Sequence, residues 1–160
     1  ESSRFEFTNA AIESMPPMSP IKPDGGEAKF PFVLVPFDTM RLWNGYIGNP
    51  QFVIKSVEDT ILKGDDVLVE INPATAKAIG LKDSSYALLT TPEGKAKVRV
   101  YYYDGIMPGL VGLPRGLGHT AFEKNLAGKG ANINALMASV EDPATGFDAA
   151  WGIRVKLDKA

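Results

Sequence analysis

Two glycine-rich segments of the chain, residues 39–57 and 105–140, hold the side chains best suited to binding chemistry. Each has a net charge of +2, so the rest of the chain sums to −6, because the whole carries −2. Glycine-rich loops beside a few cations suit an anion such as phosphate or pyrophosphate, although loops rich in charge are also simply solvated. Their charged residues are Arg41 and Lys55 in the first segment and Arg115, Glu123, Lys124 and Lys129 in the second.

Three further polar side chains lie in the second segment. His119 is the only histidine of the chain. Because no serine or cysteine nucleophile pattern accompanies it, we expect it to hydrogen-bond a ligand rather than to act as an acid–base catalyst. Asn132 and Asn134 either cap a short helix or read the edge of a heterocycle, since an amide offers both a donor and an acceptor.

Several classes of site are excluded by composition. Cysteine is absent, which removes disulfides, thiolate metal ligands, iron–sulfur ligation and thiol nucleophiles. One histidine cannot build a multi-histidine metal site. The sequence contains no phosphate-binding GxGxxG or Walker motif and no HExxH or GxSxG motif. An isoelectric point near 5.4 argues against nucleic acid as a partner. No complete active site is therefore predicted. We predict no catalytic residue and no metal-binding residue in this chain.

Short strands must position the two segments. The chain holds 16 glycines and 12 prolines, which favours a turn-rich β architecture. Alternating apolar residues place Val69 and Val100 on core-facing sides of two of these strands. The predicted strands are Phe32–Val35, Val67–Ile71, Tyr86–Thr90, Ala96–Tyr102, Leu110–Leu113 and Trp151–Leu157.

One or two short helices accompany the strands. Asn72 followed by Pro73 is a typical helix start and Gly80 a typical end, so a helix is predicted over Pro73–Ile79. A helical turn is predicted over Val57–Leu62. The fold class that follows is mainly β, a closed or partly closed barrel.

The mass of 17.2 kDa corresponds to one domain. Residues 1–29 are rich in proline and glycine and are predicted to form a linker or surface arm, and residues 30–160 form the domain. Because the chain begins at Glu1 without an initiator methionine or a leader, we expect it to be a piece of a larger protein or a processed product.

Five motifs occur in an order that is similar to a known family. Together they resemble the C-terminal molybdopterin-dinucleotide-binding domain of the dimethyl-sulfoxide-reductase family, over about residues 30–157. The branch most similar is that of polysulfide- or thiosulfate-reductase-like subunits and their relatives in quinone-linked membrane complexes. The motifs are Val69–Ala76, Gly80–Asp83, Thr91–Gly94, Pro108–Thr120 and Gly130–Leu136.

The resemblance implies a double-psi β-barrel that closes over a bis-pterin cofactor, molybdopterin guanine dinucleotide. In this family the metal ligand and the iron–sulfur cysteines belong to other domains, so molybdenum or tungsten would be held elsewhere in the parent chain. The chain would then hold the cofactor of an oxidoreductase that transfers electrons. The cofactor-binding residues implied are Arg41, Trp43, Asn44, Gly45, Gly118, His119, Thr120, Asn132 and Asn134.

The resemblance also implies partners and a location. The partners are the remaining domains of the parent subunit, an iron–sulfur electron-transfer subunit and a membrane anchor subunit. The implied location is the periplasmic face, or the membrane, to which the partners would attach the chain. The cytoplasm is the alternative. Two other functions stay open. One is a cofactor-free scaffold domain in a quinone-linked respiratory complex, and the other is a stand-alone barrel subunit.

Overall fold

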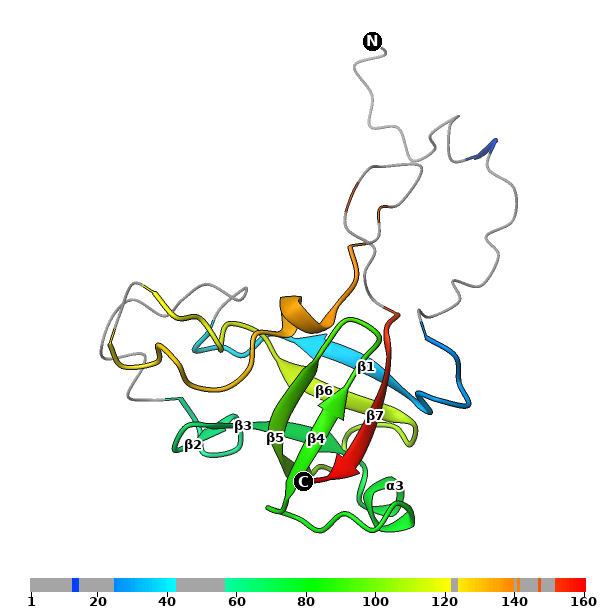
Figure 1. Ribbon diagram of the computed structural model, residues 1–160, viewed down its shortest axis with the longest axis horizontal. Coiled ribbons are helices and arrows are strands. Elements are labelled where there is room, and N and C mark those ends of the chain that lie inside the picture. The colour runs from blue at the N-terminus through cyan, green and yellow to red at the C-terminus, as the bar shows by residue number, and fades with distance from the viewer. Residues whose placement is uncertain are drawn as a thin grey trace.

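A computed structural model describes residues 13–14, 25–42, 57–121, 124–139, 141, 147 and 152–160. Strands dominate this part of the chain, with one α-helix and one 3₁₀-helix (Figure 1). The strands are β1 (Phe32–Phe37), β2 (Leu62–Lys63), β3 (Asp66–Ile71), β4 (Tyr86–Thr90), β5 (Lys95–Tyr102), β6 (Leu110–Pro114) and β7 (Arg154–Lys159). The helices are α3 (Pro73–Ala78) and the 3₁₀-helix η2 (Ile133–Leu136).

The strands close into a barrel. Their order is β2-β3-β5-β4-β7-β1-β6, and a further pairing of β3 with β6 joins the two sides. The pairs β1–β6 and β3–β5 are parallel, whereas the other neighbours are antiparallel. The prediction of a mainly β, double-psi barrel with one or two short helices is confirmed.

The core fills the barrel, because the apolar residues of each strand alternate. In β3, Val67, Val69 and Ile71 are fully buried, and Val98 and Val100 of β5 are equally buried. The prediction that Val69 and Val100 face the core is therefore confirmed.

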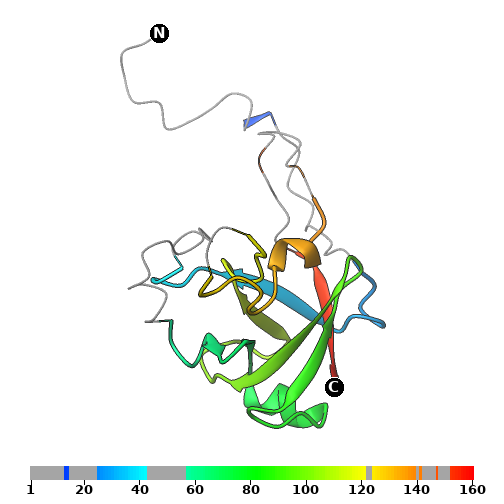
Figure 2. The ribbon, with the colours of Figure 1, turned by 60° about the vertical axis from the view of Figure 1, so that its left-hand side comes forward.

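Strand direction decides which loops share one end of the barrel. The carboxyl ends of β1 and β6 lie together because these strands are parallel, and β3 begins at that end because it is antiparallel to β6. We call this the loop end and define it as residues 38–42, 57–65, 91–94, 115–121 and 124–136. Helix α3 lies at the opposite end, as Figure 2 shows.

Helix α3 forms for the predicted reasons. The Asn72 side chain accepts a hydrogen bond of 3.0 Å from the Ala74 backbone N–H, Pro73 occupies the first helical position, and Gly80 follows with a φ of +74°. The helix ends at Ala78, one residue before the predicted end. Neither helix in the described residues is long and apolar enough to cross a membrane.

The predicted helical turn over Val57–Leu62 is only partly formed. The Ile61 and Leu62 N–H groups both donate to the Glu58 carbonyl oxygen, but Leu62 then begins β2 by pairing with Val67. Gly64, with a φ of +66°, makes the tight turn that allows this pairing. The last strand begins at Arg154, and the predicted start at Trp151 lies outside the described residues.

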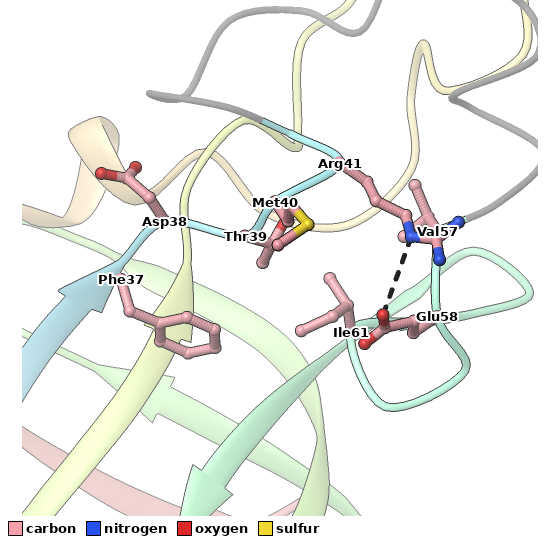
Figure 3. A pocket seen from close by; sticks show the side chains of 8 residues that line it. All are labelled: Phe37, Asp38, Thr39, Met40, Arg41, Val57, Glu58 and Ile61. Atoms are coloured by element: carbon pink, nitrogen blue, oxygen red, sulfur yellow. Dashed lines mark ion pairs between the residues drawn. The ribbon is translucent and has the colours of Figure 1, made fainter.

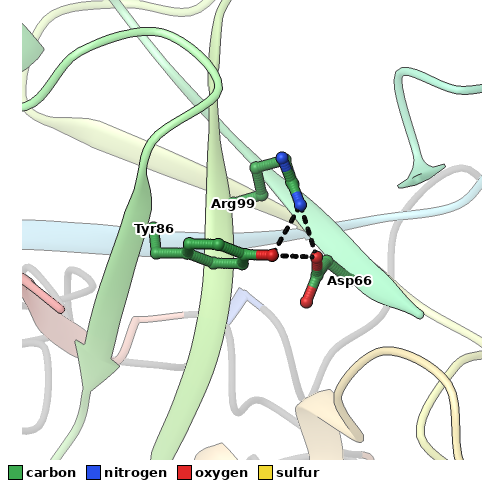
Figure 4. A network of polar contacts seen from close by, with 3 residues as sticks. All are labelled: Asp66, Tyr86 and Arg99. Carbon is green, nitrogen blue, oxygen red and sulfur yellow. Dashed lines mark hydrogen bonds and ion pairs between the residues drawn. The ribbon is translucent and has the colours of Figure 1, made fainter. Parts of the chain in front are cut away.

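A polar network on the outer wall joins three strands (Figure 4). Arg99 of β5 donates to the Asp66 carboxylate of β3 at 2.7 Å, and the Tyr86 hydroxyl of β4 donates to the same oxygen at 2.9 Å. The Lys97 Nζ atom lies 4.0 Å from the centre of the Tyr86 ring. Asp66 starts β3, so this network ties β3, β4 and β5 together.

We predict that Asp66→Asn lowers stability at neutral pH. The hydrogen bond from Arg99 holds the pKa of Asp66 below its usual 3.8, so ionised Asp66 stabilises the fold above that value. This contribution is lost as the pH falls through the lowered pKa. Denaturant unfolding of wild type and variant should therefore differ at pH 7, and the difference should shrink as the pH falls below 3.8, while Asp59→Asn, an exposed control, should match wild type throughout. A constant difference across this range would contradict the assignment.

Candidate functional site

The loop end collects the predicted site residues that the structure describes. Arg41 follows β1, Gly118 and His119 follow β6, and Asn132 and Asn134 lie at η2. Thr120, also predicted, follows His119 and is exposed. The remaining three predicted residues, Trp43, Asn44 and Gly45, lie outside the described residues.

The parallel pairing of β1 with β6 brings the first two loops together. Phe37 and Pro114 are partners in this pairing, and the Arg115 N–H extends it by donating to the Phe37 carbonyl oxygen at 2.9 Å. Both strands therefore end at the same level. Residues 38–42 and 115–121 leave the barrel side by side, although more than seventy positions separate them.

Gly118 brings the third loop into contact with the second. A Cβ atom placed on Gly118 would lie 2.1 Å from the Asn132 backbone nitrogen and 2.4 Å from the Ala131 carbonyl carbon. Its φ of +78° also belongs to the left-handed region. Only glycine allows this approach, and the approach places Gly118, His119 and Asn132 next to one another.

The backbone N–H groups of three glycines in these loops donate hydrogen bonds within the protein. Gly118 donates to the Lys129 carbonyl oxygen, Gly128 to that of His119, and Gly130 to that of Asp65, each at 2.8 Å. The sequence suggested that such groups bind phosphate. These three are already engaged, so contacts to an anion would come mainly from side chains.

Asn132 fulfils the capping role that the sequence left open. Its side-chain oxygen accepts from the Asn134 N–H at 3.0 Å at the start of η2. The structure holds η2 against the β4–β5 turn, since a Cβ on Gly94 would lie 2.9 Å from the Ala135 carbonyl oxygen. Both asparagine residues are exposed, and their amide N–H₂ groups remain donors for a ligand.

The cations of the loop end lie close to carboxylates from other segments. Arg41 lies 3.7 Å from Glu58, Arg115 lies 3.6 Å from Asp38, and Lys129 lies 3.7 Å from Asp65. Three of the cations counted along the two segments, Arg41, Arg115 and Lys129, are therefore close to carboxylates in the fold. These ion pairs are long and at least one-third exposed on each side, so they are weak and a ligand phosphate could replace the carboxylates.

A cavity of about 250 Å³ opens beside Arg41 (Figure 3). Apolar side chains form its inner wall, while one cation and two carboxylates border it. Its lining residues are Phe37, Asp38, Thr39, Met40, Arg41, Val57, Glu58 and Ile61. The cavity has room for part of a dinucleotide, such as a base or a phosphate, rather than for a whole cofactor.

Asp38 and Glu58 are site residues that sequence reasoning missed. Both were counted as part of the acidic remainder of the chain, outside the basic segments. For Asp38 a signal existed, because it directly follows β1 just as Arg115 follows the parallel strand β6. For Glu58 the sequence held no such signal, because only the folded structure brings Glu58 close to Arg41.

The donor set of the loop end is suited to binding rather than to bond-making chemistry. His119 is half-buried, and its Nδ1 atom is buried. Within the described ranges, no group of three or more histidine, aspartate or glutamate side chains could hold a metal ion. Amides, an imidazole, a guanidinium and carboxylates fit the heterocycles and phosphates of a dinucleotide.

Comparison with known proteins agrees with this geometry. Residues 51–151 match the family described as the molydopterin dinucleotide binding domain. The chain is 34% identical over 130 residues to the molybdopterin-binding-like subunit of menaquinone reductase from Nitratidesulfovibrio vulgaris, covering 81% of this chain and 19% of that protein. It is 30% identical over 144 residues to the molybdopterin-containing subunit ArrA of arsenate respiratory reductase from Shewanella sp. ANA-3, covering 84% and 17%.

A solved structure shares the fold. Acetylene hydratase from Pelobacter acetylenicus superposes with a TM-score of 0.66 at 17% identity, over 87% of this chain and 20% of that one. The chain thus spans about a fifth of the length of the curated relatives that it matches. The family match covers more than half of the sequence, and the barrel and its loop end agree with it, so the chain belongs to the molybdopterin-dinucleotide-binding domain family of the molybdopterin oxidoreductases.

Proposed function

We propose that this chain holds molybdopterin guanine dinucleotide at its loop end, as the cofactor-binding domain of an electron-transferring oxidoreductase subunit. The observation that carries the proposal is the convergence of Arg41, His119 and Asn132 from three separate loops at one end of a closed barrel. When bound, the cofactor supplies redox chemistry at molybdenum or tungsten, with the metal ligand coming from another part of the parent protein.

Each residue has a defined task in this proposal. The Arg41 guanidinium exchanges the exposed Glu58 carboxylate for a phosphate oxygen. The Glu58 carboxylate, released from Arg41, accepts the two adjacent donors of a guanine edge with its two oxygens, which supports the guanine form because adenine lacks that pair. The amides of Asn132 and Asn134 hydrogen-bond pterin heteroatoms.

The proposal extends to the parent protein. The relatives are described as subunits, which supports further domains and subunits as partners here, an iron–sulfur subunit and a membrane anchor among them. We place the assembly at the periplasmic face or at the membrane through these partners.

A nucleotide titration tests the site. Addition of guanosine diphosphate to the isotopically labelled chain should shift backbone NMR signals of residues 38–42, 115–121 and 130–136, and adenosine diphosphate should bind less well. Shifts concentrated around α3, at the opposite end of the barrel, would refute the site.

We predict that Arg41→Ala weakens guanosine diphosphate binding about two- to fivefold, the value of one exposed charge contact. Folding should stay near wild type, because Arg41 is exposed and its ion pair is long. Lys77→Ala is the matched control, since Lys77 is an exposed cation on α3. Equal weakening in both variants would show that general charge, and not the loop end, drives binding.

One observation favours a second candidate, a cofactor-free scaffold in a quinone-linked complex. The menaquinone reductase relative is described as molybdopterin-binding-like. Metal and pterin analysis of the purified parent subunit separates the two functions, because stoichiometric metal excludes the scaffold.

A further inference from the structure

The outer wall of the barrel has two unlike halves. On β4, β5 and β7 several charged side chains are paired, as in Arg99 with Asp66 of β3 at 2.7 Å and Lys156 with Asp158 at 2.8 Å. On β1, β6 and β3 the partly exposed apolar positions are Val33, Val35, Phe37 and Leu110, while Leu68 and Gly112 are buried. The partly exposed charged positions on these strands are Asp66, which pairs with Arg99, and Glu70.

Glu70 lies folded across β6. Its partner there is Gly112, and its Oε2 atom lies 3.2 Å from the position that a Gly112 Cβ would take. A ring carbon of Phe37 lies 3.3 Å from the same point, on the side of β1. On the other side of β3 the partner of Glu70 is Tyr101, whose ring stacks on Tyr103 with centroids 6.3 Å apart. The Glu70 carboxylate and the Phe37 ring thus both lie against Gly112, and Tyr101 is the neighbour of Glu70 on the next strand.

No hydrogen bond or ion pair to the Glu70 carboxylate is present among the described residues. Burial raises the pKa of Glu70, and no cation or donor among the described residues opposes this rise. A half-buried carboxylate without a partner destabilises a fold. The same carboxylate becomes favourable when a donor from outside the chain reaches it.

The surroundings point to the type of donor. A guanidinium forms paired hydrogen bonds with a carboxylate and stacks on an aromatic ring, and both groups are adjacent here. Phe37 also lines the cavity of the candidate site, so the wall is continuous with the loop end. Because the matched relatives are about five times as long as this chain, a longer polypeptide has ample surface to cover it.

We propose that the wall formed by Phe37, Glu70, Tyr101 and Gly112 docks another domain of the parent polypeptide, which inserts an arginine side chain against Glu70. We call these four residues the Glu70 wall. The proposal rests on the proposed function, because it takes the chain as one domain of a longer oxidoreductase subunit.

The first test uses the 160-residue chain. Glu70→Gln keeps the shape of the side chain and removes its charge, so the thermal midpoint at pH 7 should rise by about 2–4 °C. The matched control is Glu93→Gln on the exposed β4–β5 turn, which should leave the midpoint unchanged. A lower midpoint for Glu70→Gln would show that the carboxylate already has a partner within the chain and would overturn the proposal.

The second test compares the chain with the full-length parent protein. Carbodiimide coupling of glycine ethyl ester, read by mass spectrometry, reports whether each carboxyl group is accessible. Labelling of Glu70 should fall about fivefold or more in the parent, because a paired carboxylate is shielded from the reagent. Labelling of Asp104, which is exposed beyond the carboxyl end of β5 and away from the loop end, should stay the same in both proteins.

The outcomes of this second test are distinct. Equal labelling of Glu70 in chain and parent overturns the docking proposal, even if the parent carries its cofactor. Protection already present in the chain, rising with concentration, would assign the wall to a second copy and also overturn it. A parent that lacks pterin but protects Glu70 refutes the proposed function and leaves the docking surface standing.

Discussion

Replacement of Gly118 by alanine is expected to destabilise the chain by about 2–5 kcal/mol, which combines backbone strain with forced overpacking. The added Cβ would lie 2.1 Å from the Asn132 nitrogen, and the opposing atoms belong to the backbone. The loop that carries His119 would have to separate from the loop that carries Asn132. Denaturant unfolding measures the loss, and the nucleotide-induced shifts of both loops should disappear together.

Gly128→Ala separates the two causes of this loss. Gly128 has a φ of +80°, nearly that of Gly118, but among the described residues no atom beyond its chain neighbours lies within 4 Å of its Cβ position. The variant should therefore lose only about 1–2 kcal/mol, the strain of a left-handed alanine. Equal losses in the two variants would show that contact between the loops contributes nothing.

Leu113→Ala is the second substitution with a large expected effect, about 2–5 kcal/mol. Leu113 is fully buried in β6, the strand that closes the barrel by pairing with both β1 and β3. The cavity left behind would weaken the closure and the loop end that follows it. Calorimetric or denaturant unfolding gives the loss directly.

The same strand offers a control for Leu113. Leu110 begins β6, and its side chain is partly exposed on the outer wall. Leu110→Ala removes the same number of carbon atoms and should cost well under half as much, because less apolar surface is exposed to water on unfolding. Similar losses at the two positions would contradict the assignment of inward and outward faces.

The strands were predictable because their signals are local. Alternation of apolar residues located β3, β4 and β5 to within one residue, and Asn72 with Pro73 located the start of α3. The boundaries of β7 were less accurate, because its start at Arg154 is determined by pairing with Val33 of a distant strand.

The electrostatics of the molecule were not predictable from the sequence. Counting charges along residues 39–57 and 105–140 gave +2 for each segment. The fold, however, brings Glu58, Asp38 and Asp65 close to cations of these segments. The network of Asp66, Tyr86 and Arg99 and the lone carboxylate of Glu70 arise in the same way. Each depends on strand register, and register depends on the closed barrel as a whole.

The candidate site was predictable in part, and for a different reason. The ordered motifs indicated the family, and through it the loops around Gly118 and Asn132. The structure adds the physical cause of their meeting, the contact of Gly118 with the Asn132 backbone. All the implied cofactor-binding residues stay predictions as cofactor ligands, and Trp43, Asn44 and Gly45 also lie outside the described residues.

The position of β7 in the sheet has a consequence for how the molecule is made. Although β7 is the last strand in sequence, it lies between β4 and β1. During synthesis, the ribosome releases both neighbours long before the strand that must join them, so the barrel cannot close co-translationally until residues 154–159 emerge. Pairing across such separations makes folding slow, and the unjoined edges of β1 and β4 are exposed to misassembly in the meantime. The complete barrel that presents the loop end is thus available only after β7 has been inserted.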